Sequence, residues 1–217
     1  MRNMKKILIF AVMVFLGILA LSFYKKTSSP EDVLIRETFE KYKTAILNDQ
    51  GEEAVKYVDS RTLKYYGNIL ESVKNDNKEK VNSLSISDRL SVLLIRQMAS
   101  RQEIQSFDAK TFFVYFVNKG MVGKNGVANN SIGTIINSGN FAKGELVINK
   151  KNSTLYLHFY KENDMWKIDL TSLLTIANIA VQQVIKTVGQ SEEEFIFSSI
   201  EMVTGKKPDE SVWNPIK

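Results

Sequence analysis

The single histidine and the absence of cysteine limit the chemistry that this chain of 217 residues can perform. Without cysteine there is no disulfide, no thiolate ligand and no thiol nucleophile. A zinc ion at His158 would need carboxylates as its other protein ligands, and the sequence shows no suitable cluster. A serine nucleophile on a tight turn would need a G-x-S-x-G motif, which the sequence lacks. We therefore predict no metal site and no cofactor.

Asp169 is the one carboxylate that we single out as a candidate catalytic residue. It lies near the end of a predicted strand, where burial can raise the pKa of a carboxyl group and prepare a general base. The flanking apolar residues alternate with it, at Trp166, Ile168 and Leu170. This alternation turns Asp169 toward water or toward the first amides of the next helix, which it would cap. We favour the cap and assign no catalytic residue.

The strand before Asp169 carries two different rows of side chains. One row is Leu155, Leu157 and Phe159, and the other is Tyr156, His158 and Tyr160. Because successive side chains of a strand point to opposite faces, both faces of this strand are expected to be partly covered. We expect helices over the apolar row. The aromatic row is predicted to contact a second copy of the chain or another partner.

The N-terminus contains an apolar run, residues 7–24, between two pairs of lysines. As a helix it would be about 27 Å long, close to the hydrocarbon thickness of a bilayer. Residues 1–26 are therefore predicted to be an uncleaved signal anchor, with Tyr24 at the interface. The alternative is a signal peptide removed near Ser22, which leaves a secreted or periplasmic protein. Both interpretations place the domain outside the cytoplasm, and the first makes it a single-pass protein of the cell membrane.

The positive charge of the chain belongs to its N-terminus. The formal net charge is +5, and residues 1–26 contain five basic residues and no acid. The remaining basic residues balance the 24 acidic ones, so the domain is formally neutral. Without a basic cluster, nucleic acid is not expected as a partner.

The hydrophobic pattern predicts helices first, strands second and helices again. The first helix starts at Pro30, capped by Ser29. Further helices are predicted over 52–73, broken at Asp59-Ser60, then over 87–98 and 108–119, with a loop at 74–80. Alternation predicts strands over 134–137, 144–150, 154–160 and 165–170, which form an antiparallel meander. Helices follow over 171–188 and 192–203. The fold class is α+β, with a linker at 27–30, a domain at 31–205 and a tail at 206–217.

The predicted helix over 171–188 is apolar around more than one face. Two interpretations remain open. It is either a core helix that closes the domain, which we favour, or a docking surface for a membrane partner. In the second case the residues Phe195-Ile196-Phe197 would enlarge the apolar patch.

The final hairpin, Phe159 to Leu170, has an aromatic strand, a polar turn and then Trp-Lys-Ile-Asp. In this respect it resembles the nuclear-transport-factor-2-like superfamily, in particular its extracytoplasmic bacterial members. The opening helix followed by Gly51-Glu52-Glu53-Ala54 is also similar. The resemblance implies a curved antiparallel sheet wrapped around helices, a cone with an internal pocket, and often a dimer. Two features depart from it: the long insert over about 74–130 and the two helices after the sheet.

These observations lead to a functional expectation. We expect a membrane-tethered, extracytoplasmic binding or assembly module without catalysis of its own, contacting a partner through the row of Tyr156, His158 and Tyr160. The alternative is a small-molecule binder or an isomerase-like enzyme that uses the pocket of the cone. In that case the resemblance implies Asp169 as the base and Tyr42 or Tyr115 as the donor to an oxyanion.

Overall fold

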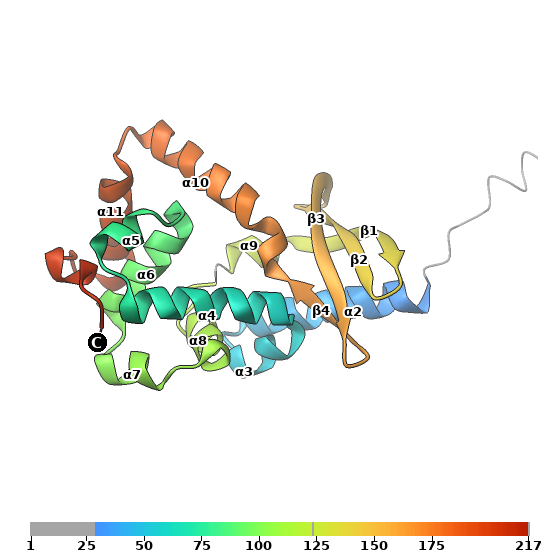
Figure 1. Ribbon diagram of the computed structural model, residues 1–217. Coiled ribbons are helices and arrows are strands. Elements are labelled where there is room, and N and C mark those ends of the chain that lie inside the picture. The colour runs from blue at the N-terminus through green and yellow to red at the C-terminus, as the bar shows by residue number, and fades with distance from the viewer. Residues whose placement is uncertain (1–28, 123, 217) are drawn as a thin grey trace, which may run out of the picture. The chain divides into compact units, whose positions relative to one another are not determined.

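The computed structural model describes residues 29–122 and 124–216. Within them the chain is mixed α+β, as predicted, with helices before and after a curved, four-stranded antiparallel sheet (Figure 1). The predicted anchor or signal segment, residues 1–26, and the first two residues of the predicted linker lie outside the described residues. Among the helices of the described part, none is both long and apolar enough to cross a bilayer.

A series of helices precedes the sheet. They are α2 Pro30–Leu47, α3 Gly51–Ala54, α4 Ser60–Asn75, α5 Lys78–Asn82, α6 Ile86–Met98, α7 Arg101–Ser106, α8 Ala109–Asn118 and α9 Asn125–Ala128, with the 3-10 turn η1 Val55–Tyr57 after α3. The Ser29 hydroxyl accepts a hydrogen bond from the N–H of Asp32 at 3.1 Å, which confirms the predicted cap. Asp59 caps α4, so the predicted break at Asp59-Ser60 is also confirmed.

The predicted loop over 74–80 is wrong. Helix α4 continues to Asn75, and the side chain of Asn77 accepts from the N–H of Lys80 to start α5. Helices α7 and α9 are too short to show a helical period in the sequence.

The sheet is the predicted meander, in the order β1-β2-β3-β4. Its strands are β1 Asn130–Ser138, β2 Phe141–Ile148, β3 Lys151–Glu162 and β4 Met165–Asp169. The free edge of β4 is covered at one point, where Val58 forms a parallel bridge with Ile168 and the N–H of Asp59 donates to the Ile168 carbonyl at 2.9 Å. Pairing at this edge leaves less exposed backbone for association with another strand.

Two clusters of buried side chains form the core. The first lies between α2, α8 and one face of the sheet, and includes Phe39, Tyr42, Phe113 and Phe159. This cluster covers the row of Leu155, Leu157 and Phe159, as the alternation predicts. The second cluster joins α4, α6, α8 and α11 without the sheet. The core is therefore partly a helix-on-sheet layer and partly a helical bundle.

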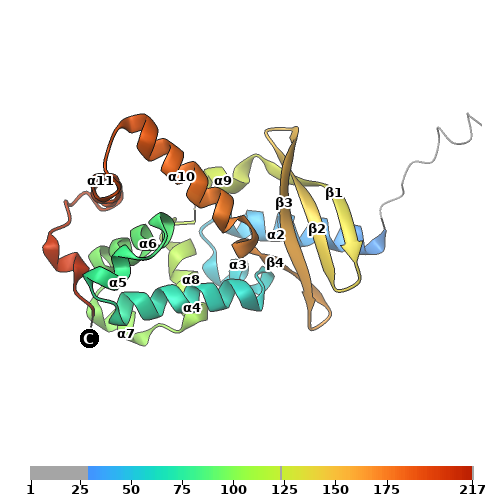
Figure 2. The same ribbon diagram turned by 45° about the horizontal axis from the view of Figure 1, so that its top comes forward.

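The chain after the sheet consists of η2 Leu170–Leu173, α10 Leu174–Val188, α11 Glu192–Thr204 and η3 Glu210–Trp213. In Figures 1 and 2, α10 leaves the end of β4 and runs away from the sheet toward α11. The interpretation of this segment as a core helix is wrong, because Ile185 is the one buried residue of α10.

The segment 206–217 is predicted to be a tail outside the domain, but part of it belongs to the core. Val212 and Trp213 are buried in the second cluster. The guanidinium of Arg96 fixes them by donating to both carbonyls, at 3.3 and 3.1 Å. The prediction fails because the residues around Val212 and Trp213 are mostly polar or charged, so the local sequence gives no sign that these two are buried.

Candidate functional site

The face of the sheet opposite the first core cluster carries the predicted aromatic row. We call it the outer face, and its residues include Phe141, Lys143, Glu145, Tyr156, His158, Tyr160, Glu162, Lys167 and Asp169. Residues paired directly across antiparallel strands share a face, and the register pairs His158 with Lys143 on β2 and with Asp169 on β4. Tyr156 is the most exposed of the aromatic row, with 36 % of its surface accessible.

Tyr160 lies beneath a cation. The guanidinium carbon of Arg61, in the first turn of α4, is 3.5 Å from the centre of the Tyr160 ring. Arg61 also donates to a carboxylate oxygen of the fully buried Asp59 at 3.1 Å. This hydrogen bond raises the pKa of Arg61, with smaller contributions from Tyr160 and Asp169. Phe141, its cross-strand neighbour, is 4.9 Å from Tyr160 between ring centres. The tyrosine thus contacts both a cation and a second ring.

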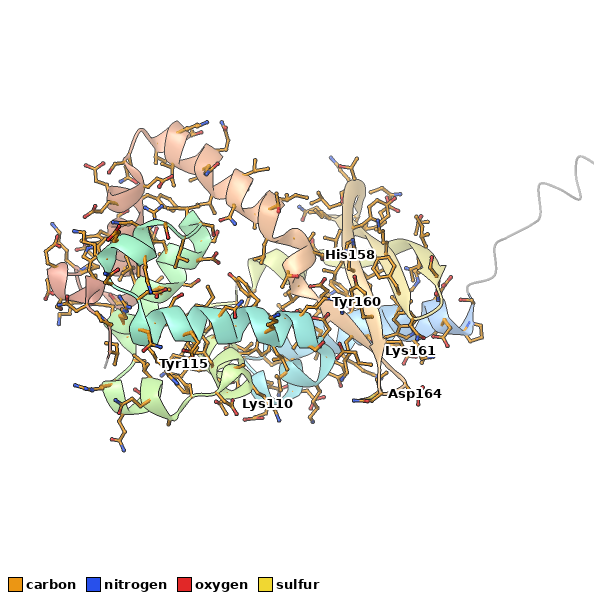
Figure 3. The ribbon with its side chains drawn as sticks, in the orientation of Figure 1. Lys110, Tyr115, His158, Tyr160, Lys161 and Asp164 are labelled. Carbon is orange, nitrogen blue, oxygen red and sulfur yellow. The ribbon has the colours of Figure 1, made fainter. Side chains whose placement is uncertain are left out.

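His158 lies between groups of opposite charge. Its ring meets Phe141 edge to face, with 5.3 Å between centres. Burial lowers the pKa of the imidazole most, the neighbouring Lys143 lowers it further, and Asp169 opposes both. The imidazole is therefore neutral at neutral pH and can both donate and accept a hydrogen bond. Figure 3 places His158 and Tyr160 on the same strand, facing the start of α10 and α4.

Asp169 acts as a cap, as the alternation predicts. Its side chain is buried, and one carboxylate oxygen accepts from the N–H and the hydroxyl of Thr171, at 2.9 and 2.5 Å. The Ser172 hydroxyl donates to the Asp169 carbonyl and accepts from the His158 N–H. These bonds start η2 and tie it to β3. The contacts of Asp169 accordingly fit a residue that holds the strand-to-helix turn.

The structure does not bring Asp169 together with the tyrosines that the isomerase-like alternative requires. Figure 3 places Tyr115 on α8, well away from His158, the cross-strand neighbour of Asp169. Tyr115 packs against Phe107 instead. Tyr42 lies in the first core cluster, where burial raises the pKa of its hydroxyl far above the ordinary value. Among the carboxyl groups with a shifted pKa in the described part, Glu53, Glu103, Asp108, Glu194 and Asp209, every shift is downward.

The space under the sheet is filled by the protein itself. Phe39, Tyr42, Phe113 and Phe159 occupy it, each at most 3 % exposed. A surface cavity of about 350 Å³ lies between α2 and the α3-η1 segment, and is lined by Glu37, Glu40, Lys41, Thr44, Ala45, Gln50, Glu53 and Tyr57. None of these lining residues belongs to the sheet. Within the described residues no three metal-binding side chains of the His, Cys, Asp or Glu type gather at one point.

Most of the accessible charge near the outer face is positive. Arg61 and Lys143 are exposed, and half of the Arg61 side chain is accessible. The acidic residues Asp59, Glu145 and Asp169 are buried, and each already accepts a hydrogen bond from the backbone. Glu162 is partly exposed, and its carboxylate accepts from the N–H and the hydroxyl of Ser60. A partner that meets this surface therefore encounters cations and aromatic rings.

Sequence reasoning missed part of this surface. The predicted second strand begins at Gly144 and leaves out Phe141 and Lys143, whereas β2 begins at Phe141. The aromatic and basic residues just before Gly144 alternate and are the signal that would have extended the strand. Arg61 follows a recognised cap, but its position over Tyr160 depends on how α4 meets β3, which a sequence does not encode locally.

Comparison of the chain with known protein families, with curated proteins and with solved structures finds no match. The resemblance to the nuclear-transport-factor-2-like superfamily consequently stays a prediction, and function has to be argued from the outer face.

Proposed function

We propose that this chain is a membrane-tethered module outside the cytoplasm that binds another protein of the cell envelope through the outer face of its sheet. The observation that carries the proposal is the stack of Arg61 on Tyr160 beside His158 and Tyr156. The partner is expected to present acidic and aromatic side chains. No catalytic role is assigned to the chain.

The composition of the outer face supports a protein partner. Tyrosine and arginine are, with tryptophan, the residues enriched among those that dominate the energy of protein interfaces. Tyrosine buries a large rigid area at a small cost in conformational entropy, and arginine forms charged and stacking contacts. The bond to Asp59 already orients Arg61, so little further ordering is needed on binding. Because the nearby acids Asp59, Glu145, Glu162 and Asp169 already accept hydrogen bonds within the chain, the accessible Arg61 and Lys143 favour carboxylates on the partner.

The tether is proposed from the apolar segment 7–24 and its flanking lysines. We propose an uncleaved anchor, with removal near Ser22 as the alternative. Intact-mass measurement of the protein from its host membrane separates the two, since cleavage shortens the chain by about its first 22 residues. Labelling of an engineered surface cysteine by a membrane-impermeant reagent in intact cells is expected if the domain lies outside the cytoplasm.

The finer fold assignment also belongs to the proposal. A curved meander with α2 on its inner face supports a cone-like relative of the nuclear-transport-factor-2-like superfamily. In this chain the interior of the cone is occupied by aromatic side chains. Because these side chains fill the interior, the alternative of an enzyme with an internal pocket has little support. The proposal therefore places partner binding on the outer face.

The central test is photo-crosslinking in cells that make the full-length protein. A photoreactive phenylalanine derivative replaces Tyr156, and the control position is Lys110 on α8, which is exposed and lies far from the outer face in Figure 3. We expect one or more specific envelope proteins to be crosslinked from position 156. Equal capture of the same proteins from position 110 would contradict the proposal.

A charge reversal adds a second readout. Arg61→Glu is expected to reduce capture from position 156 at least about tenfold. The new carboxylate would face the acidic side chains expected on the partner, and like charges that meet in an interface cost several kcal/mol. Lys64→Glu, an exposed change of the same charge three residues later on α4, is the matched control and is expected to leave capture unchanged. If both variants capture the partner as well as the original protein does, the outer face is not the binding surface.

A further inference from the structure

Helix α10 has two opposite faces, and one of them packs against the domain. The inner face consists of Leu174, Asn178, Val181 and Ile185, at spacings of four, three and four residues. Ile185 is 6 % exposed, and Val181 packs against the second core cluster. The amide oxygen of Asn178 accepts from the N–H of Ser87 at 3.2 Å, near the start of α6. These contacts fix how α10 is rotated about its axis.

The opposite face is apolar and open. We call it the outer stripe, and it comprises Ile176, Ile179, Ala180, Gln183, Val184 and Thr187, all exposed. The accessible fractions are 43 % for Ile176, 60 % for Ile179 and 48 % for Val184. Positions at i, i+3, i+4, i+7, i+8 and i+11 lie on one side of a helix. A helix that buries one stripe and exposes a second apolar stripe marks an interaction surface.

We propose that the outer stripe pairs with the outer stripe of a second copy, with the two α10 helices antiparallel across a two-fold axis. The spacing of the stripe reads the same in both directions, as an isologous contact requires. An axis between positions 181 and 182 sets Ile179 opposite the partner's Val184. It also sets Ala180 opposite the partner's Gln183, and the small side chain of Ala180 lets the helices approach closely at the centre.

The charges around the stripe fit a second copy. The stripe contains no charged residue, so two copies meet without burying a charge. Lys186 is the one charged residue of α10. In the antiparallel arrangement the two Lys186 residues lie about 13 Å apart along the helix axis, beyond the screening length of about 8 Å at physiological salt.

A lipid surface fits the stripe less well. Helices that lie in the membrane interface carry lysine and arginine along their polar face and tryptophan or phenylalanine in their apolar face. The outer stripe has no aromatic residue, and α10 has a single lysine. An uncharged stripe of small and aliphatic residues with few polar ones is typical of helix-to-helix packing instead.

The size of the stripe predicts a weak dimer. Helix α10 has 15 residues and is about 22 Å long. A contact made by one face of so short a helix buries less than the roughly 800 Å² per partner of a standard interface. Association is therefore expected to depend on a high local concentration. The proposed membrane tether would supply it by confining copies to one plane.

The absence of cysteine makes a clean test available. Ala180→Cys is introduced into the full-length protein, and isolated membranes are treated with a short bismaleimide. A crosslinked species of twice the chain mass is expected. The control is Lys110→Cys, which is also exposed but lies on α8. Equal dimer yields at positions 110 and 180, absence of a dimer at 180, or linkage of position 180 to a different protein would each overturn the proposal.

Charge insertion identifies the contact. In a chain that already carries Ala180→Cys, the further change Ile179→Glu is expected to lower the dimer yield about tenfold or more, because it buries unpaired carboxylates. Met202→Glu, at an even more exposed apolar residue of α11, is the matched control and is expected to leave the yield unchanged. An unchanged yield with Ile179→Glu would contradict the stripe. Capture from position 156 is measured in parallel, so the loss of one interaction is distinguished from the loss of the other.

Discussion

The guanidinium of Arg61 lies 3.5 Å from the centre of the Tyr160 ring, and this contact joins the start of α4 to the outer face of the sheet. A second contact runs beside it, where the backbone N–H and the hydroxyl of Ser60 donate to the carboxylate of Glu162 across 102 residues of sequence. The first turn of α4 therefore packs directly on the outer face of the sheet. A substitution in either element should change the stability contributed by the other.

A double-mutant cycle of Arg61→Ala and Tyr160→Leu is expected to give a coupling energy of about 0.5–1 kcal/mol in urea unfolding. The magnitude is modest because half of the Arg61 side chain is in water. Lys64→Ala in the same cycle should give no coupling with Tyr160. A coupling of zero for Arg61 would show that the stack contributes nothing to stability.

The stability of the fold should fall as the pH is lowered from 7.5 to 5. His158 is the only histidine, and burial with Lys143 nearby lowers its pKa below the ordinary 6.5 in the folded state. The unfolded chain then binds the proton more readily, so stability is full above pH 6.5 and is lost as the pH falls toward the lowered pKa. Urea midpoints at several pH values measure this. His158→Gln should flatten the profile in this window, and an equally steep profile in the variant would assign the titration to other groups.

Arg96→Ala should destabilise the protein by about 3 kcal/mol or more. The buried guanidinium donates to five carbonyls, those of Ser72, Val73, Asp76, Val212 and Trp213. Removing it leaves buried carbonyl groups without a donor and releases η3. Urea unfolding measures the loss, and the exposed Arg101→Ala should change stability by less than about 0.5 kcal/mol. Near-equal stabilities of the two variants would show that Arg96 does not hold the C-terminal segment.

Asp169→Ala should cost about 1 kcal/mol of stability, the usual value of a lost helix cap. Asp169→Asn should cost less, because the amide oxygen still accepts from the N–H of Thr171. Both variants are expected to keep crosslinking from position 156. A loss of capture in Asp169→Asn without any loss of stability would instead indicate a direct role in binding or chemistry.

Local patterns in the sequence predicted the elements well. The caps at Ser29 and Asp59, the alternation through 155–160 and the polar hairpins all act within a few residues, so the helices, the meander and the two faces of β3 follow from them. The cap function of Asp169 follows for the same reason.

Long-range packing explains what the sequence did not predict. Helix α10 looks like a core helix because it is apolar on two sides, and the sequence does not say which side the domain covers. Trp213 stands in a polar segment, and its burial depends on Arg96 in a distant helix. The contact of Arg61 with Tyr160 likewise requires the docking of α4 onto the sheet.

The contacts between the η1-α4 segment and β4 constrain the order in which parts of the protein can fold during synthesis. The Thr62 hydroxyl donates to the carbonyl of Ile168, 106 residues later in the chain. At a synthesis rate of about 5–20 residues per second, the first half of this junction waits about 5–20 s for the second to be made. If the chain is exported during synthesis, the early helices emerge with their sheet contact unmade. The contact between α4 and β4 then forms late in biogenesis, and the core is completed only when Trp213, which follows β4 in the chain, has also been made.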